Sequence, residues 1–281
     1  MRNRFALWRM YGKMYRAGKR TVRKMLRKGA NPYLKMLRDL IDEDSRAECI
    51  ELGTMDIPTN RIVGITAEEK QNKYSYDFLP LSRPNGDFAS KWCKLYWYFF
   101  SNKAARCPVT CYEYMGEFYI IDGVKRVSIA KCCGLPTVTA SVIRMLSAKT
   151  QEESVLRYFD FLEVFEKTGL YQISFTKSGA FAQLQTALGF APDYVWKEED
   201  RLEFLFNWYE FEQAFQEAFG GYLNVTPADA LVVLLEKYNY DTIKKMSRTV
   251  LVTLLRSAWK VLYGVHKLNA VSDCQVYQDV Q

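Results

Sequence analysis

The sequence predicts an α+β protein, in which a small mixed sheet lies between a basic N-terminal helical arm and a mostly helical C-terminal domain. Residues 118–143 read in order as strand, loop, helix, glycine and strand. Residues 1–38 place cations between apolar residues at helical intervals. After about residue 149, apolar residues recur at helical spacing between glycine and proline breaks. We therefore divide the chain into an arm, a sheet domain, a helical domain and a loose tail, at residues 1–45, 46–148, 149–268 and 269–281.

The composition is that of a globular protein. At 281 residues, 49% of them hydrophobic, the chain is long enough to bury a substantial core. No uninterrupted apolar run is long enough to span a membrane, and Leu251–Val265 contains Arg256 and Lys260. Residues 1–9 lack the apolar stretch of a secretory signal. The odd number of cysteines, seven, argues against a disulfide framework, so we expect a reducing, cytoplasmic location.

The positive charge of the chain is concentrated in its first segment. Residues 1–38 contain thirteen lysines and arginines and no acidic residue, so the remaining residues carry 7 − 13 = −6. Apolar residues recur between these cations at near-helical intervals, which predicts an amphipathic helix. Gly18 weakens this helix, and the Gly29–Pro32 segment ends it.

Three interpretations of the basic arm remain open. The arm can lie along a nucleic-acid backbone, where lysine and arginine displace counterions. It can rest on an anionic membrane surface with Trp8 and Phe5 inserted. It can also dock on the protein's own acidic body, with its cations only keeping it soluble. The candidate contact residues on nucleic acid or membrane are Arg16, Lys19, Arg20, Arg23, Lys24, Arg27 and Lys28.

The stretch from Phe118 to Ala130 predicts a corner between a strand and a helix. Val109–Tyr114 and Phe118–Ile121 form a predicted hairpin, and Asp122 and Gly123 follow as a polar break. The next helix opens with Lys125 and Arg126 and ends near Gly134, before a predicted strand at Thr137–Val142.

This corner is a candidate anion site. Backbone N–H groups at the start of a helix have no internal partners, and the helix dipole adds positive charge there. Gly123 leaves the backbone open to a ligand, and Lys125 and Arg126 supply contacts to phosphate oxygens. The alternative is an ordinary strand-to-helix turn, with Asp122 as the N-cap and two solvated cations.

Three blocks between about Glu51 and Arg144 resemble the ParB/sulfiredoxin-like domain, as found in uncharacterised bacterial regulator-like proteins. The first is Met55–Gly64, which resembles the opening strand and polar turn of that domain. The second is Asp77–Leu81, followed by Phe88, Lys91, Trp92 and Leu95. The third and most specific is the corner Asp122–Ala130.

The resemblance implies a nucleotide or phosphate site. In ParB-type proteins the equivalent corner grips nucleotide phosphates, which implies Gly123, Lys125 and Arg126 here, with Arg61 as a second cation and Ser128 as a weaker candidate. The implied cofactor is a nucleoside triphosphate with magnesium, and the implied role is DNA-associated regulation or partition. Val124 and Lys125 stand where a sulfiredoxin has its cysteine and histidine, so sulfinic-acid repair is not expected. The ParB block that follows the domain has no match in residues 147–158.

Two rival functions stay open, and both belong to other classes. The first is a metal-dependent phosphotransferase or nuclease that uses Asp122 or Glu113. The second is a degenerate interaction module that has lost its ligand. No histidine-rich or zinc-type spacing appears, because His266 is the only histidine and the cysteine spacing is not that of a zinc knuckle. A homodimer is compatible with each of these functions.

The remaining elements are predicted to be helical. Phe88–Lys103 is an aromatic helix whose broad apolar face we assign to the core rather than to base stacking. Thr226 and Pro227 form a strong helix start. The last predicted helices could form a helix-turn-helix, but Lys244–Arg248 lacks the glycine turn, so a packed bundle is preferred. The predicted C-terminal helices are 155–165, 181–188, 201–219, 228–238, 241–246 and 249–263.

Overall fold

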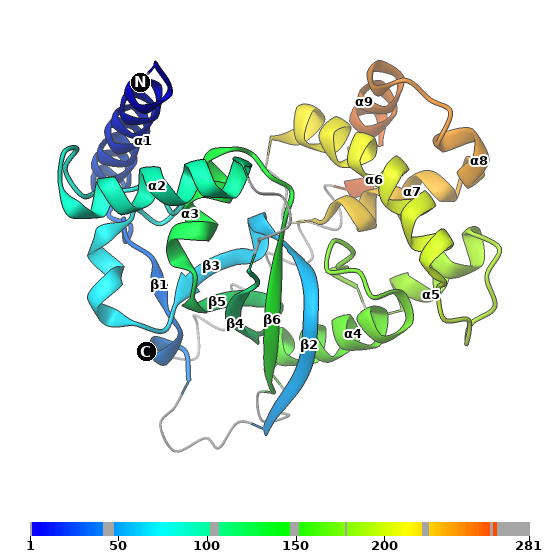
Figure 1. Cartoon of the computed structure of the whole chain (residues 1–281). Helices are drawn as coiled ribbons and strands as arrows, with labels where there is room; N and C mark the ends of the chain where they lie inside the picture. The colour runs from blue at the N-terminus through cyan, green and yellow to red at the C-terminus, as the bar shows by residue number, and fades with distance from the viewer. Residues whose placement is uncertain are drawn as a thin grey trace, which may run out of the picture. The chain divides into compact units, whose positions relative to one another are not determined.

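A computed structural model describes residues 2–41, 48–101, 107–146, 152–177, 179–220, 225–258 and 261–262. The chain divides into two compact units, Met1–Lys149 and Thr150–Gln281, each described by itself below (Figure 1). The predicted arm belongs to the first unit and is not a separate body. His266 and the predicted loose tail lie outside the described residues.

The first unit is built on a six-stranded mixed sheet with the strand order β1-β3-β5-β4-β6-β2. Neighbouring strands run parallel in the pairs β1–β3, β3–β5 and β4–β6, and antiparallel in the pairs β4–β5 and β2–β6. The prediction of a mixed sheet combined with helices is thereby confirmed. The strands are β1 (Lys35–Met36), β2 (Glu48–Pro58), β3 (Ile62–Ile65), β4 (Val109–Tyr114), β5 (Glu117–Asp122) and β6 (Thr137–Leu146).

The hairpin between β4 and β5 forms where the sequence predicts it. Tyr114 pairs with Glu117, so Met115 and Gly116 make a two-residue turn. Both residues have positive φ, 54° and 77°, as the tight hairpin turn that fits the strand twist requires. Residues of β4 alternate between buried and half-buried, because one face of the strand points into the core.

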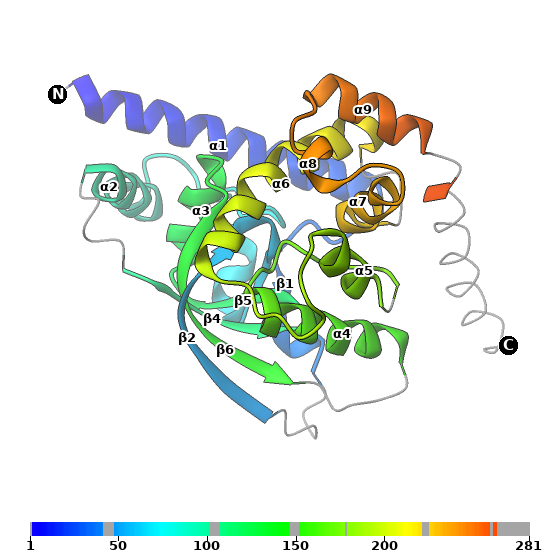
Figure 2. The same ribbon diagram turned by 90° about the vertical axis from the view of Figure 1, so that its right-hand side faces the viewer.

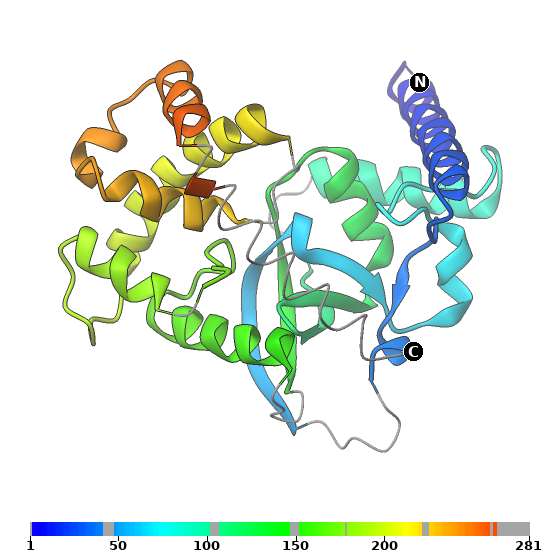
Figure 3. The same ribbon diagram turned by 180° about the vertical axis from the view of Figure 1, so that it is seen from behind.

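Strand β2 forms one edge of the sheet and pairs only with β6 among the described strands (Figure 3). Most of its residues are exposed, and its pairing slips between Glu51 and Gly53, where Gly53 has a φ of 77°. A bulge and charged side chains are common protections of an exposed sheet edge against pairing with another chain.

Three helices stack over the sheet in the first unit: α1 (Arg2–Arg27), α2 (Asp87–Ser101) and α3 (Val124–Cys132). Helix α3 contacts β4 and β6, α2 packs on α3, and α1 packs on α2 (Figure 1). Trp92 of α2 is fully buried between Tyr11 of α1 and Ile129 of α3, which confirms that the aromatic helix serves the core. Three short 3-10 helices complete the unit: η1 (Leu37–Asp39), η2 (Thr59–Arg61) and η3 (Glu68–Lys73).

Helix α1 is continuous in spite of Gly18 (Figure 2). A Cβ atom at Gly18 would lie 3.0 Å from the carbonyl oxygen of Pro80 and 3.1 Å from the Leu81 side chain. The glycine therefore lets the helix approach the loop closely, and packing offsets its weaker helix propensity. The sequence correctly predicts the end of the helix, since Gly29 follows with a φ of 69°.

The second unit is helical in its described part. Thr226 caps α7 as predicted, because its hydroxyl accepts the amide of Asp229 at 3.1 Å. Helix α9 turns Leu251, Val252 and Leu255 into the core and contacts α6, so these helices form a packed bundle. The helices are α4 (Glu153–Thr168), α5 (Ala180–Ala187), α6 (Glu198–Phe219), α7 (Pro227–Leu235), α8 (Tyr240–Ile243) and α9 (Arg248–Ser257).

Candidate functional site

The corner between β5 and α3 has the predicted path but a different cap. Gly123, not Asp122, is the N-cap of α3, and it adopts the left-handed conformation with a φ of 99°. Any other residue would be strained there, because L-residues disfavour this region. The prediction that Asp122 caps the helix is therefore wrong.

The space that Gly123 leaves open is filled by the protein itself. A Cβ atom at this position would lie 2.7 Å from Cγ1 of Val109 and 2.9 Å from Nε and Nη2 of Arg126. The missing side chain thus accommodates a guanidinium group from the first turn of the same helix. The glycine is required for this internal contact.

Arg126 joins three parts of the corner. Its Nη1 donates to the carbonyl oxygens of Cys107 and Pro108, at 2.7 and 2.8 Å. Its Nη2 donates to Oδ2 of Asp122 at 2.7 Å, and only 18% of the side chain is exposed. Charge-assisted hydrogen bonds of this length are strong. Arg126 therefore ties the start of β4 to the end of β5, and a phosphate at the corner would have to displace these bonds.

A small cavity lies beside Arg126. Its volume is about 100 Å³, and Asp56, Cys107 and Thr139 line it together with Arg126. Pockets for drug-sized ligands typically measure at least about 300 Å³. The cavity is too small for a nucleotide, although several waters would fit.

Ser128, the weakest candidate among the predicted phosphate contacts, does not lie at the surface of the site. It is fully buried, and its Oγ accepts the indole N–H of Trp92 at 3.1 Å. A phosphate on the surface does not reach a hydroxyl in the core. Ser128 satisfies the polar end of a buried tryptophan instead.

The side chain of Lys125 contacts different residues from those that Arg126 contacts. Its Nζ lies 5.3 Å above the ring of Phe88, a cation–π contact. Partial burial lowers the pKa of Lys125, and the nearby charges of Lys91, Lys70 and Lys73 lower it further. These four lysines, which we name the lysine cluster, come from α3, α2 and η3.

Few carboxylates neutralise the lysine cluster. Asp87 neutralises part of it, because its carboxylate pairs with Lys91 of the cluster at 2.8 Å. Glu68 of η3 is paired with Arg38 at 2.7 Å. The sequence did not reveal this cluster, because its members are separated by up to 55 positions and only the fold brings them together.

Arg61, the predicted second cation, lies half-buried on η2, which contacts α3. The start of η2 is held by Thr59, whose Oγ1 donates to the carbonyl oxygen of Leu135 at 2.6 Å. The structure therefore brings the segment of Arg61 to α3, while Arg126 bonds to Cys107, Pro108 and Asp122.

Glu113, a candidate catalytic residue, is fully buried. One carboxylate oxygen accepts the amide of Gly116 at 2.8 Å, and the other pairs with Nε of Arg144 on β6. Glu113 thus fixes the hairpin turn and joins two strands. Asp122 is likewise held by Arg126, so both carboxylate candidates have structural partners.

The part of the chain that the structure describes contains no cluster of metal-binding side chains. No three His, Cys, Asp or Glu side chains gather there in a way that could hold an ion. Nor does any helix of that part combine the length and apolar character of a bilayer span.

The cations of α1 form an extended charged surface on the first unit. Arg9, Lys13 and the seven predicted arm residues from Arg16 to Lys28 are all exposed. Within the described residues, no carboxylate lies within 4.0 Å of any of these nine cations. Among the described residues, no acidic surface therefore holds the helix.

Apolar contacts hold α1 in place instead. Tyr11 is fully buried, its ring meets Trp92 edge-on at 5.4 Å, and its hydroxyl donates to the carbonyl oxygen of Ser82 at 2.8 Å. Six cations, which we name the α1 stripe, recur with spacings of 4, 3, 4, 3 and 4 residues and so share the outward face. They are Arg9, Lys13, Arg16, Arg20, Arg23 and Arg27.

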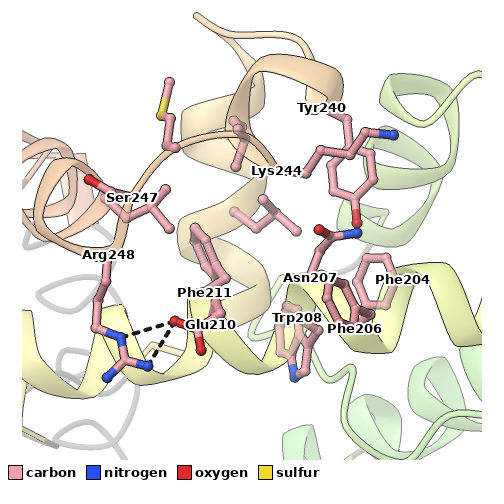
Figure 4. Close-up of a pocket in the computed structure, with 14 residues that line it drawn as sticks. Phe204, Phe206, Asn207, Trp208, Glu210, Phe211, Tyr240, Lys244, Ser247 and Arg248 are labelled. Carbon is pink, nitrogen blue, oxygen red and sulfur yellow. Dashed lines mark hydrogen bonds and ion pairs between the residues drawn. The ribbon is translucent and has the colours of Figure 1, made fainter.

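The second unit contains a cavity of about 200 Å³ between α6, α8 and α9 (Figure 4). Phe204 and Phe211 of α6 and Tyr240 of α8 give it an apolar lining. Two cations at its rim pair with α6: Lys244 with Glu203 at 2.9 Å, and Arg248 with Glu210 at 2.7 Å. These pairs join α8 and α9 to α6.

Comparison with known proteins does not assign the chain to a family. The chain matches no protein-family model and no curated protein. The resemblance to the ParB/sulfiredoxin-like domain therefore stays an expectation drawn from the residues.

Proposed function

We propose that the protein binds the phosphate backbone of nucleic acid through the α1 stripe, in a DNA-associated regulatory role in the cytoplasm. The observation that carries the proposal is a row of exposed cations without carboxylate partners among the described residues. From Arg9 to Arg27 the row spans 18 residues, about 27 Å at 1.5 Å per residue. Such a row can contact several successive phosphates and displace their counterions.

The fixed position of α1 favours nucleic acid over a membrane surface. A helix that inserts into a bilayer needs a free apolar face. Here Tyr11 is fully buried and Trp8 packs against the same apolar cluster, so that face is already occupied. Only the cationic face is available, which suits a phosphate backbone.

No side chain of the stripe is assigned to a base, so we propose binding that depends little on sequence. The lysine cluster on α3, α2 and η3 is a second place for phosphate, and it supports the predicted nucleoside triphosphate better than Arg126 does. Magnesium would arrive with the triphosphate. Asp122 and Glu113 are each held by an arginine, which disfavours the alternative of a metal-dependent enzyme that uses them.

Fluorescence anisotropy with a labelled DNA duplex at several salt concentrations tests the proposal. The logarithm of the association constant should fall linearly with the logarithm of the salt concentration, with a slope of about −0.9 per phosphate contacted. Replacing Arg16, Arg20 and Arg23 by alanine should make the slope less steep by about 2 to 3. Lys237→Ala, an exposed cation of the second unit, is the matched control and should leave the slope unchanged.

A flat salt dependence, or equal binding by the triple variant, would overturn the proposal. Vesicles containing phosphatidylserine test the membrane alternative in parallel. Stronger retention on vesicles than on DNA at the same ionic strength would assign the stripe to lipid headgroups. Titration of Lys125→Ala with ATP, CTP and GTP in the presence of magnesium tests the lysine cluster separately.

A further inference from the structure

Helix α6 carries an exposed face that is both aromatic and acidic. Phe206 is 82% exposed, and Leu202 and Tyr209 beside it are 61% and 56% exposed. The opposite face of the helix is buried in the core of the second unit through Trp208 and Phe211. Large apolar side chains gathered on one outward face are unusual, and they often mark an interaction surface.

Four exposed glutamates flank these apolar side chains. They are Glu199, Glu203, Glu210 and Glu217. Together with Phe206 and Gln213 they occupy positions with spacings of 4, 3, 4, 3 and 4 residues, so all six lie on one face of the helix. We name this row the α6 stripe. It spans 18 residues, about 27 Å.

The α1 stripe and the α6 stripe have the same spacing, the same length and opposite charge. The spacing reads identically from either end, so the two helices match in parallel and in antiparallel orientation. Both orientations place four cations of α1 opposite the four glutamates, and one arginine opposite Phe206. Glu203 and Glu210 already pair with Lys244 and Arg248, so the attraction comes mainly from Glu199 and Glu217 at the two ends of the stripe. An arginine guanidinium stacks well on an aromatic ring, so Phe206 does not interrupt the match.

We propose that α1 of one copy docks along α6 of a second copy of this chain. The cations of the α1 stripe are exposed in the described structure, and so are Phe206 and the four glutamates of the α6 stripe. The apolar face of α1 is covered by its own unit, so its cationic face is the surface left for a partner. This inference goes beyond nucleic-acid binding, because the same stripe then serves two acidic partners.

One consequence is competition between the two partners. The glutamates on α6 and the phosphates of DNA each form a row of negative charges that the α1 stripe can contact. A second copy and a DNA duplex therefore exclude one another from the α1 stripe. Association of the chain should weaken when DNA is added, and it should weaken when salt screens the charges.

Sedimentation equilibrium of the full chain tests the proposal. The weight-average mass of the wild type should rise with protein concentration at about 50 mM NaCl, and much less at about 500 mM. Replacing Glu199 and Glu217 by lysine should weaken association roughly tenfold or more, because two attractive pairs become repulsive. Among the described residues, no lysine or arginine lies within 4.0 Å of the carboxylate of either glutamate. Asp193→Lys with Glu236→Lys adds the same charge elsewhere on the second unit and serves as the control.

A charge swap supplies the decisive measurement. Arg9→Glu with Arg27→Glu should weaken association to a similar extent on its own. Mixing this variant with the Glu199→Lys, Glu217→Lys variant should restore a heterodimer, because Arg9 and Arg27 face these two glutamates in either orientation. Circular dichroism and thermal melting establish that each variant is folded before it is mixed.

Three results would overturn the inference: a wild type that is monomeric at all concentrations, a Glu199→Lys, Glu217→Lys variant that associates like the wild type, or a mixture that stays monomeric. A crosslink between α1 and α6 within a monomer would do so as well. The Glu199→Lys, Glu217→Lys variant keeps the α1 stripe and should bind DNA at least as tightly as the wild type. Loss of self-association with intact DNA binding therefore separates this inference from the proposed function.

Discussion

Tyr11 of α1 and Trp92 of α2 meet edge-to-face, with their ring centroids 5.4 Å apart and their planes inclined by 69°. Both side chains are completely buried. The contact lies where the cationic helix enters the core of the first unit, so it helps to hold the α1 stripe on a rigid support. Electrostatic binding by α1 depends on this apolar contact.

We expect Trp92→Ala to lower the free energy of unfolding of the first unit by about 3 to 5 kcal/mol, since it empties a large buried site. Urea denaturation followed by circular dichroism measures the change. Trp97→Ala on the same helix is the control, because this side chain is 49% exposed and its removal should change stability by less than about 0.5 kcal/mol. Equal losses in the two variants would contradict the assigned packing.

Replacement of Arg126 tests whether it is a structural clamp. Arg126→Ala leaves the carbonyl oxygens of Cys107 and Pro108 and the Asp122 carboxylate without their donor. The free energy of unfolding should fall by about 1 to 3 kcal/mol. Arg126→Lys should recover only part of this loss, because one ammonium group does not reproduce the planar fork of the guanidinium.

The control for Arg126 is Arg38→Ala, which breaks an exposed ion pair with Glu68 and should change stability little. A variant at Arg126 that binds phosphate more weakly while keeping full stability would instead assign this arginine to the ligand. The two outcomes are distinguished by measuring unfolding and nucleotide titration on the same preparation.

The buried pair of Glu113 and Arg144 gives a third prediction. Removing one partner, as in Arg144→Met, leaves an unpaired buried charge and should cost about 3 to 5 kcal/mol of stability. Replacing both, with Glu113→Leu and Arg144→Met, should recover part of this loss, because desolvation of the two charges is avoided while the amide of Gly116 loses its acceptor. A double variant as unstable as the sum of the two single variants would show that the ion pair is not the cause. Urea denaturation of all three variants checks this cycle.

Lys131 gives a prediction about pH. Burial lowers its pKa from 10.5 to about 8, and its Nζ lies 5.1 Å from the ring centroid of Phe78. The unfolded chain binds this proton more tightly, so the charged lysine destabilises the fold fully below about pH 8. This penalty disappears as the pH rises from about 8 towards 10.5. Lys131 alone should therefore make stability rise with pH in this window.

Lys131→Met should stabilise the first unit at pH 7 by up to about 3 kcal/mol, and the gain should vanish near pH 10.5. Subtracting the variant's pH profile from that of the wild type removes the other groups that titrate in the same range. Lys237→Met, an exposed control, should give a difference that is flat with pH. A pH-independent gain for Lys131→Met would assign the effect to packing alone.

Local patterns in the sequence predicted most elements of the fold correctly. The hairpin Val109–Ile121 needed only alternation and a two-residue turn, and the cap at Thr226 needed only a hydroxyl before proline. The amphipathic arm also emerged from spacing alone. These features depend on residues that are neighbours along the chain, so short-range geometry is sufficient to predict them.

The candidate site was less predictable, because its chemistry depends on contacts between distant segments. The sequence identified Arg126 and Ser128 as polar groups near a helix start. Only the tertiary structure bonds Arg126 to the carbonyl oxygens of Cys107 and Pro108. It also buries Ser128, whose hydroxyl accepts the indole N–H of Trp92. The same holds for the lysine cluster, whose members come from three separate elements.

By itself, the sequence determined that a cationic amphipathic helix precedes a small mixed sheet and a set of helices. The tertiary structure decided which face of that helix is exposed and which cations have acidic partners among the described residues. The physical reason is that periodicity defines the two faces of a helix, whereas burial and ion pairing depend on what packs against them. The contacts of Tyr11 with Ser82 and Trp92 hold the apolar face of the helix against the core, so that its cationic face is exposed.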